Sequence, residues 1–261
     1  MSLNISTIKS LNQAGIKKII NLFFLSVIPL FSYSQEIIIP KKNLVDKKWI
    51  KDQTYRMNWS MLKDTTRIII GIVNTKVMVL DNEVQVITEV KLKGQASSWI
   101  DSTIVKKSDL SPIYHSSYNA QRDMVIHFDQ EIKGFYRDKI TQKTTAINEK
   151  LQSNYFDSNF YPTLINWLPL KTDYKADINI YDYNPKTMGG IVKVHLLGVK
   201  EGRYLTTKSG ERKVWIVELT DDIGGGTGAK SIYQIDQLTR QLYKQEISIG
   251  GRKMEMILLE E

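Results

Sequence analysis

The sequence contains no cysteine among its 261 residues. This absence excludes a disulfide framework, a thiolate metal site and a cysteine nucleophile. It also excludes a lipid anchor attached to an N-terminal cysteine. We therefore expect the mature protein to be soluble, or to associate with a membrane through its fold alone.

The one long apolar run lies near the N-terminus, from Ile19 to Phe31. Lys17 and Lys18 precede it, and the small-residue site Ser32-Tyr33-Ser34 follows it. The run is shorter than the ~20 residues that cross a bilayer as a helix. This three-part plan predicts a secretory signal peptide over residues 1–34, cleaved after Ser34, and a retained anchor is the alternative.

The chain lacks a concentrated charge of one sign. Its formal net charge is +8, but three of its 36 Lys and Arg residues lie in the leader, which contains no acid. The mature chain would therefore carry 33 basic and 28 acidic residues, a surplus of five. These residues alternate along the chain and form no basic stripe with interleaved aromatics, so we do not expect a nucleic-acid partner.

After the leader, few stretches have apolar residues repeating at the 3.6-residue period of a helix. A lead-in segment over residues 35–54 comes first, and a single β-rich domain over residues 55–261 follows, because short runs rich in Val, Ile, Thr, Tyr and Trp recur between turn residues. We predict strands at 55–62, 67–73, 76–80, 84–92, 98–105, 113–118, 124–129, 131–137, 139–148, 174–181, 191–198, 213–219, 231–235, 242–249 and 253–259.

Alternation along these runs indicates antiparallel strands with one buried face. In Val84–Leu92 the apolar residues fall mainly on every second position, as the pleat of a strand requires. Asp81-Asn82, Lys133-Gly134 and Gly250-Gly251 are predicted to separate consecutive strands. The last of these pairs predicts a two-residue hairpin.

The main interruption is Ser158–Leu170, for which we predict a short helix that plugs one end of a curved sheet. Ser158 or Asn159 would cap it, Pro162 is tolerated in a first turn, and Pro169 would stop it. The fold class expected is mostly β, a single strongly curved antiparallel sheet of the half-barrel kind with this one helix.

Aromatic residues are the candidates for a ligand-binding concave face or rim. Tyr183 lies in a turn-like segment, Tyr-Asp-Tyr-Asn-Pro, that could touch a ligand or could be a plain turn. The others fall in strands or in the helix, where ordinary core packing is an equal explanation. The candidate residues are Trp59, Trp99, Tyr161, Trp167, Tyr183 and Trp215.

The sequence segments that resemble catalytic or cofactor-binding motifs do not have the residue spacing that those motifs require. Residues 224–231 resemble a phosphate-binding loop, but Ala229 separates the last glycine from Lys230 and a strand follows instead of a helix. His115, His127 and His195 lie in different strands without the close spacing of a zinc site. We expect no cofactor, no metal and no assigned catalytic residue.

Several segments resemble a secreted bacterial family known as a domain of unknown function, DUF3108. The resemblance covers about residues 50–260 and rests on structural segments more than on chemical ones. These segments are Asp101-Ser102, Asp109-Leu110-Ser111-Pro112-Ile113, Tyr161–Leu170, Tyr233–Asp236, Thr239–Leu242 and Lys244–Glu246.

The resemblance implies a curved antiparallel half-barrel closed by a short helix, similar to the periplasmic lipoprotein carriers of the LolA and LolB type. Those carriers hold acyl chains in an apolar concavity. The family offers no catalytic residues to carry over. The ending Phe31-Ser-Tyr-Ser-Gln35 also resembles leaders of Bacteroidetes, which implies a Gram-negative periplasm.

Three functions follow as hypotheses. The leading one is a periplasmic binding or scaffolding protein that shelters a lipid or another hydrophobic ligand, with peripheral membrane contact as a further possibility. The second is an outer-membrane β-barrel, although many runs are shorter than the ~9–11 residues of a membrane strand. The third is a hydrolase that uses His115 or His127 with a nearby Ser or Asp, although no Gly-x-Ser-x-Gly motif is present. The sequence does not indicate an oligomeric state.

Overall fold

A computed structural model describes residues 36–64, 66–186, 189–226 and 228–260. Internal contacts divide the chain into residues 1–34 and 35–261, and the fold below is that of the second unit. The predicted signal peptide lies outside the described residues and stays a prediction.

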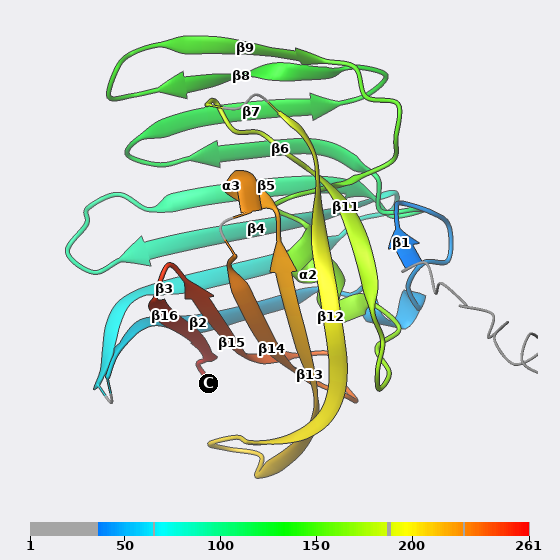
Figure 1. Ribbon diagram of the computed structural model, residues 1–261, viewed down its shortest axis with the longest axis vertical. Helices are drawn as coiled ribbons and strands as arrows, with labels where there is room; N and C mark the ends of the chain where they lie inside the picture. Colours follow the sequence, from blue (N-terminus) through cyan, green and yellow to red (C-terminus); the bar gives the residue numbers. More distant parts are fainter. Residues whose placement is uncertain (1–35, 65, 187–188, 227, 261) are drawn as a thin grey trace, which may run out of the picture. The chain divides into compact units, whose positions relative to one another are not determined.

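Nearly all the regular structure is β-strand (Figure 1). The strands are β1 (Glu36–Ile38), β2 (Gln53–Lys63), β3 (Thr66–Val79), β4 (Glu83–Leu92), β5 (Trp99–Lys106), β6 (Pro112–Tyr118), β7 (Arg122–Phe128), β8 (Ile132–Asp138), β9 (Thr144–Glu149), β10 (Phe156–Asp157), β11 (Ala176–Asp182), β12 (Gly190–Leu205), β13 (Glu211–Asp221), β14 (Lys230–Asp236), β15 (Leu242–Ile249) and β16 (Arg252–Leu258). The helical segments are η1 (Lys47–Trp49), α2 (Tyr161–Trp167) and α3 (Ile223–Gly226).

All sixteen strands belong to one sheet. Strands β2 to β9 form one antiparallel meander and β11 to β16 another, and the pairing of β16 with β2 joins them. Only the short β1 and β10 run parallel to their partner, β11. The sheet ends at β1 and β9 and is not closed into a barrel, so the predicted mostly β, open antiparallel sheet is confirmed.

The sheet curves so strongly that its two meanders face each other. Asp157 in β10 lies beside β11, ten strands away from β6 in the sheet order, yet its carboxylate is 2.8 Å from His115 Nδ1 in β6. Thr103 in β5 reaches the same carboxylate at 2.6 Å. We call the surface enclosed between the meanders the inner face.

Two of the predicted interruptions between strands are wrong. The runs at 67–73 and 76–80 form the single strand β3, because Asn74 and Thr75 continue the pairing with β4, and the irregularity is instead a bulge near Ile70. Gly134 lies inside β8 opposite Ile126 rather than in a turn. The backbone of β7 approaches Gly134 too closely to admit a Cβ atom, which is why the position needs glycine.

The last hairpin is confirmed. Gly250 and Gly251 have φ angles of 54° and 76° and connect β15 to β16 by two residues. Positive φ at both central positions belongs to the turn whose twist matches paired strands, and glycine adopts it without steric cost.

Helix α2 is shorter than the predicted 158–170, and its predicted cap is wrong. Phe160 is the N-cap residue and makes no side-chain capping bond. Ser158 instead donates its backbone N–H to Tyr181 O, and Asn159 donates its side-chain amide to Thr103 Oγ1. Both candidate caps therefore tie the segment to neighbouring strands.

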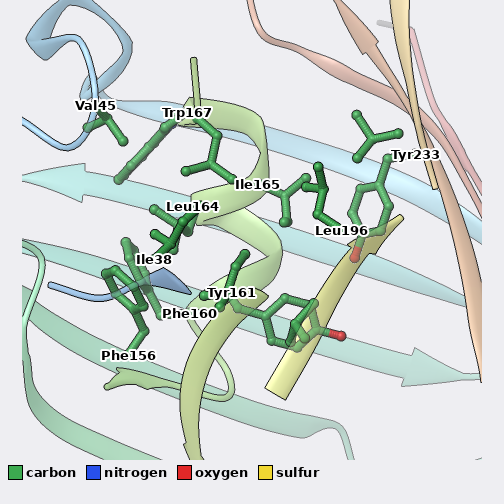
Figure 2. Packing of buried hydrophobic residues seen from close by; sticks show 14 of the residues in the cluster. Ile38, Val45, Phe156, Phe160, Tyr161, Leu164, Ile165, Trp167, Leu196 and Tyr233 are labelled. Carbon is green, nitrogen blue, oxygen red and sulfur yellow. The ribbon is translucent and has the colours of Figure 1, made fainter. Parts of the chain in front are cut away.

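Helix α2 is buried on nearly every side and forms the centre of the main core (Figure 2). Leu164 and Ile165 have no exposed surface, and Trp167 has only 3%. Figure 2 shows Ile165 toward Leu196 of β12 and Tyr233 of β14, and Leu164 toward Ile38 of β1. A second, smaller core joins β7, β8, β9 and β11 through Met124, Ile126, Phe128, Ile132, Ile147 and Tyr181.

The described part of the lead-in, residues 36–54, is part of the fold. Ile38 in β1 is fully buried and Val45 is 7% exposed, and both belong to the core around α2. Neither had a sequence signal, because a three-residue strand carries too little periodicity to be recognised.

We expect Leu164→Ala to lower the free energy of unfolding by about 2–5 kcal/mol, because it leaves a cavity at the centre of the core. Leu205→Ala is the matched control, since that side chain is 77% exposed and should change stability by less than about 0.5 kcal/mol. Urea unfolding followed by tryptophan fluorescence measures both. Equal effects of the two variants would contradict the central role of α2.

Candidate functional site

A row of apolar side chains crosses four adjacent strands on the inner face. Ile247 in β15 pairs with Met254 in β16, Met254 pairs with Met61 in β2, and Met61 pairs with Ile68 in β3. Directly paired residues of antiparallel strands point to the same side of the sheet. We call these four residues, Ile247, Met254, Met61 and Ile68, the apolar row.

The side to which the row points follows from its neighbours. Gln245 lies two residues before Ile247 and donates a 3.0 Å hydrogen bond to the hydroxyl of Tyr233, a core residue with no exposed surface. Met256, two residues after Met254, packs against the same core. The apolar row therefore continues the inner face beyond the core.

The apolar row remains accessible to solvent. Met61 is 38% exposed and Ile68 is 44% exposed, while Ile247 and Met254 are half-buried. The core around α2 includes Val77, at the opposite end of β3 from Ile68. At ~3.3 Å per strand residue these two positions are about 30 Å apart, so α2 covers one end of the inner face and leaves the row open at the other.

A second row lies next to the first and extends to β4. Trp59 pairs with Met256 on one side and with Gly71 on the other, and Gly71 pairs with Leu92. The Leu92 side chain lies over Gly71, where an added Cβ would come within 2.6 Å of the Lys91 carbonyl. The indole nitrogen of Trp59 is buried without a hydrogen-bond partner.

Trp99 marks the point where the apolar surface becomes polar. Its partner Val90 is buried, whereas its indole N–H lies 2.8 Å from Asp101 Oδ1 and 3.2 Å from Ser117 Oγ. The Arg122 guanidinium lies over the Trp99 ring at 5.7 Å. One aromatic residue thus joins the apolar wall to a group of hydrogen-bonding side chains.

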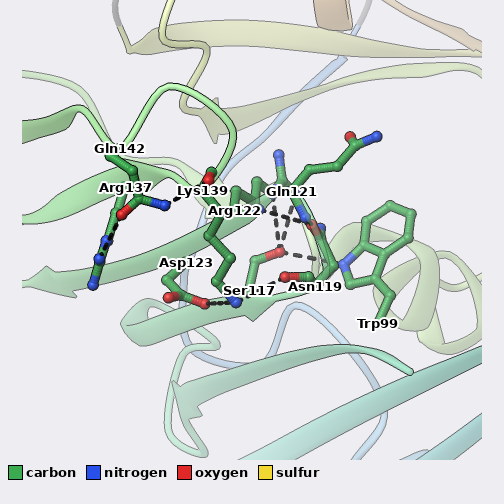
Figure 3. Close-up of polar contacts among 9 residues, drawn as sticks. All are labelled: Trp99, Ser117, Asn119, Gln121, Arg122, Asp123, Arg137, Lys139 and Gln142. Carbon is green, nitrogen blue, oxygen red and sulfur yellow. Dashed lines mark hydrogen bonds and ion pairs between the residues drawn. The ribbon is translucent and has the colours of Figure 1, made fainter. Parts of the chain in front are cut away.

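Arg122 is held by Ser117 without an ion pair (Figure 3). Its Nε and Nη2 donate to Ser117 Oγ at 3.2 and 3.0 Å, and in the described part of the chain no carboxylate lies within ion-pair distance of it. Asp138 is its partner across β8 but accepts from the backbone N–H groups of residues 140 and 141. The guanidinium therefore retains donor capacity.

The turns around Arg122 fix its backbone (Figure 3). Asn119 Oδ1 accepts from the backbone N–H groups of Gln121 and Arg122 at 2.8 and 2.9 Å. Lys139 bridges the adjacent turn, with Nζ 2.6 Å from Asp123 Oδ1 and 2.9 Å from Asn119 O. These bonds connect the β6–β7 turn to the β8–β9 turn.

His115, Asp157 and Thr103 form a buried polar group deeper on the inner face. His115 is 6% exposed and Asp157 is fully buried, and Thr103 donates to the second carboxylate oxygen of Asp157. Burial lowers the pKa of His115, but the neighbouring Asp157 carboxylate more than offsets this effect, so the pKa is raised above its ordinary value. A protonated imidazole at this position neutralises the buried carboxylate.

This arrangement does not place Asp123 in a Ser-His-Asp triad with His115. Asp123 pairs with Lys139 instead, and His115 is bound by Asp157. Ser117 lies on the same strand face as His115 but accepts bonds from Arg122 and Trp99. Among the residues described, Ser117 makes no hydrogen bond to a histidine or carboxylate, so a nucleophile is not defined.

Two further acids line the interior near α2. Tyr161 of α2 donates a 3.3 Å hydrogen bond to Asp221 of β13. Burial raises the pKa of Asp182, and repulsion from Asp157 adds to the effect. Burial likewise raises the pKa of Asp221, and repulsion from Asp182 adds to it. These carboxyls make the inner face between α2 and the open end partly polar.

His195 lies between two carboxylates, with Nδ1 2.8 Å from Asp177 and Nε2 3.3 Å from Asp222. Burial lowers the pKa of His195, but both acids raise it and the net shift is upward.

In the described residues no group of three or more His, Asp or Glu is placed to hold a metal ion. No helix in the described segments is long and apolar enough to span a membrane.

The six sequence candidates do not form one site. Trp59 and Trp99 belong to the wall of the open end. Tyr161 and Trp167 lie in the core around α2, and Trp215 packs against it. Tyr183 packs on the smaller core with its ring 6.0 Å from that of Tyr136.

Sequence reasoning missed the four residues of the apolar row and Arg122. Met61, Met254 and Ile247 fit the apolar–polar alternation of their strands. Alternation predicts which side chains point to the inner face, but it does not show which of them other side chains leave exposed in the folded protein. Arg122 had no signal at all, because an arginine after a turn is ordinary.

Two open clefts lie at the other end of the strands, against the lead-in. Their volumes are about 770 and 670 Å³, and both are lined by Lys106 and Ile113. Lys42 and Lys47 line the smaller cleft together with Asp81. None of the six sequence candidates contributes to either cleft.

The buried histidine gives a pH prediction. We expect Asp157→Asn to lower the pKa of His115, because the carboxylate that stabilises the imidazolium is removed while the burial remains. Since the folded-state pKa is raised, the pair should stabilise the fold below the unfolded pKa of about 6.5 and lose this contribution as pH rises through the folded value.

An NMR titration of the His115 ring protons measures this shift. Asp123→Asn is the matched control, because Asp123 pairs with Lys139 and should leave the pKa of His115 unchanged. An unaltered titration in Asp157→Asn would show that the pair does not control the histidine.

The fold described above is similar to that of a solved structure. The crystal structure of a β-barrel-like protein of domain of unknown function DUF1849 from Brucella abortus has a TM-score of 0.51 to this chain. The match covers 81% of this chain and 97% of that one at 8% sequence identity, which shows a shared fold alone. No curated protein matches the sequence.

The family model described as Protein of unknown function (DUF3108) matches residues 54–257. The chain belongs to this family, as its sequence segments predicted. The similarity to LolA and LolB carriers rests on the sequence resemblance only.

Proposed function

We propose that this protein is an exported binding protein that shelters a lipid acyl chain or another hydrophobic ligand against the inner face of its sheet. The observation that carries the proposal is the apolar row, Ile247, Met254, Met61 and Ile68. These side chains lie on the enclosed face of a curved sheet but are only partly covered. Partly covered apolar side chains on a concave surface are typical of ligand sites.

The energetics of the row favour an elongated apolar ligand. Three strand spacings of ~4.8 Å give the row a length of about 14 Å. Each methylene buried against it contributes about 0.8 kcal/mol. A chain laid along the four strands would therefore bind without any directional contact, which suits a lipid tail.

The polar group beside Trp99 suits the other end of such a ligand. Arg122 has donor capacity and stacks on Trp99, which itself closes the apolar surface. A carbonyl, hydroxyl or phosphate oxygen could accept from the guanidinium. Asp101 accepts the indole N–H of Trp99 beside it, so the guanidinium is the free donor of this group.

A scaffolding role is the second candidate, and a specific observation favours it. Helix α2 fills the inner face at one end of the sheet with fully buried side chains, so the interior is not hollow along its length. If the enclosed face only stabilises the fold, partner proteins would bind to the outer surface of the sheet. The two roles differ in whether ligand binding depends on the apolar row.

We expect Met61→Lys and Ile68→Lys each to weaken binding of a dansyl-labelled undecanoic acid at least tenfold, since each would place a charge against the bound chain. Leu238→Lys and Leu205→Lys are the controls, because these side chains are 75% and 77% exposed and lie outside the row. Fluorescence titration of residues 35–261 measures all four variants. Equal binding by all four, or no binding by the wild type, favours the scaffolding role.

Export is a separate expectation. The protein purified from the periplasm of its native host should begin at Gln35, because cleavage is predicted after Ser34. Mass spectrometry of the intact protein and of its N-terminal peptide reads this directly, with Gln35 free or cyclised to pyroglutamate. A mature protein that begins within residues 1–17 would show that the leader is retained.

A further inference from the structure

The open end of the inner face is bordered by two neighbouring hairpin tips. The β2–β3 tip comprises residues 61–64 and 66–69, and the β15–β16 tip comprises residues 249–254. They lie side by side because β16 pairs with β2, with Lys253 opposite Leu62. We call these two segments the paired tips.

The paired tips carry positive charge that the rest of the described protein does not neutralise. Lys63, Arg252 and Lys253 are exposed, and no carboxylate among the described residues lies within ion-pair distance of them. Arg67 is different, because it pairs with the buried carboxylate of Glu255. Asp64 is the single acid within the described residues of the tips.

Exposed apolar side chains accompany these cations. Ile69 is 48% exposed and pairs with Ser60, so it lies on the sheet face opposite the apolar row. Ile68 and Met61 are exposed on the other face of the same hairpin. A β-hairpin with isoleucine or methionine on both faces of its tip has no face that water solvates well.

We infer that the paired tips dock on an anionic lipid bilayer surface. Unpaired Lys and Arg side chains are attracted by anionic headgroups, and adjacent apolar side chains enter the boundary between headgroups and acyl chains. No helix or covalent lipid is needed for a contact of this kind. Because the paired tips include Met61, Ile68 and Met254 of the apolar row, a bilayer lipid would reach the inner face there without crossing water.

The other end of the strands offers a matched comparison. Lys42, Lys47 and Lys106 are also exposed and lack a carboxylate within ion-pair distance in the described segments, but they border the clefts beside the lead-in. Asp81 and Glu83 line the same cleft, so positive charge there is mixed with negative charge. Removing three charges at either end changes the net charge by the same amount.

Co-sedimentation with vesicles tests the inference. Residues 35–261 should bind vesicles of phosphatidylcholine with roughly 30 mol% phosphatidylglycerol, and binding should fall with added salt. The triple variant Lys63→Gln, Arg252→Gln, Lys253→Gln should bind at least tenfold more weakly. The triple variant Lys42→Gln, Lys47→Gln, Lys106→Gln should bind within about twofold of the wild type, since its charges lie at the other end.

A single apolar variant separates this inference from the proposed ligand site. Ile69→Ser should weaken vesicle binding at least threefold but leave binding of dansyl-labelled undecanoic acid unchanged, because Ile69 faces away from the apolar row. Leu238→Ser controls for the loss of an exposed apolar side chain. Circular dichroism and the melting temperature show whether each variant is folded.

Three results would overturn the inference: no sedimentation of the wild type, equal losses in the two triple variants, or no effect of Ile69→Ser. Equal losses would mean that net charge alone drives association. Loss of fatty-acid binding in Met61→Lys together with no vesicle binding by the wild type would support the ligand site and reject the docking surface.

Discussion

The structure depends on the burial of one short helix inside one open sheet. Helix α2 has seven residues, no side-chain cap and six buried side chains, so it is stable only because the two meanders enclose it. In turn, the meanders face each other because α2 and the Asp157 contacts with β5 and β6 fill the space between them. The main core, which contains the buried residues of α2, depends on this packing.

The same packing determines where function can lie. Because α2 occupies one end of the inner face, the strands extend past the core at the other end and leave apolar side chains partly uncovered. These side chains border a polar group around Trp99 and Arg122. They also border the two cationic hairpin tips at the ends of the same strands. An apolar wall, hydrogen-bond donors and a charged rim in this order are what an amphipathic ligand from a bilayer would require.

Much of the fold was predictable because strands are recognised by the alternation of apolar and polar residues and by the turn residues between them. Val84–Leu92 and the Gly250-Gly251 hairpin are examples in which local pattern and tertiary structure agree. The pattern failed at Gly134, where glycine serves the close approach of a neighbouring strand, and at Ser158, whose backbone bonds to another strand instead of capping α2. In both cases the deciding contact is with a neighbouring strand, which the local pattern does not show.

The candidate site was less predictable for the same reason. Aromatic residues were the reasonable expectation, but Tyr161 and Trp167 serve the core, while methionines and isoleucines form the accessible wall. Only the register of β15, β16, β2 and β3 shows that Ile247, Met254, Met61 and Ile68 share one face.

Photo-crosslinking with a diazirine-bearing fatty acid tests the central claim most directly. Peptide mapping after irradiation of residues 35–261 should place the label on the inner face of β2, β3, β15 and β16, at Met61, Ile68, Ile247 or Met254. Label confined to the outer face of the sheet, or to the clefts beside the lead-in, would contradict the account.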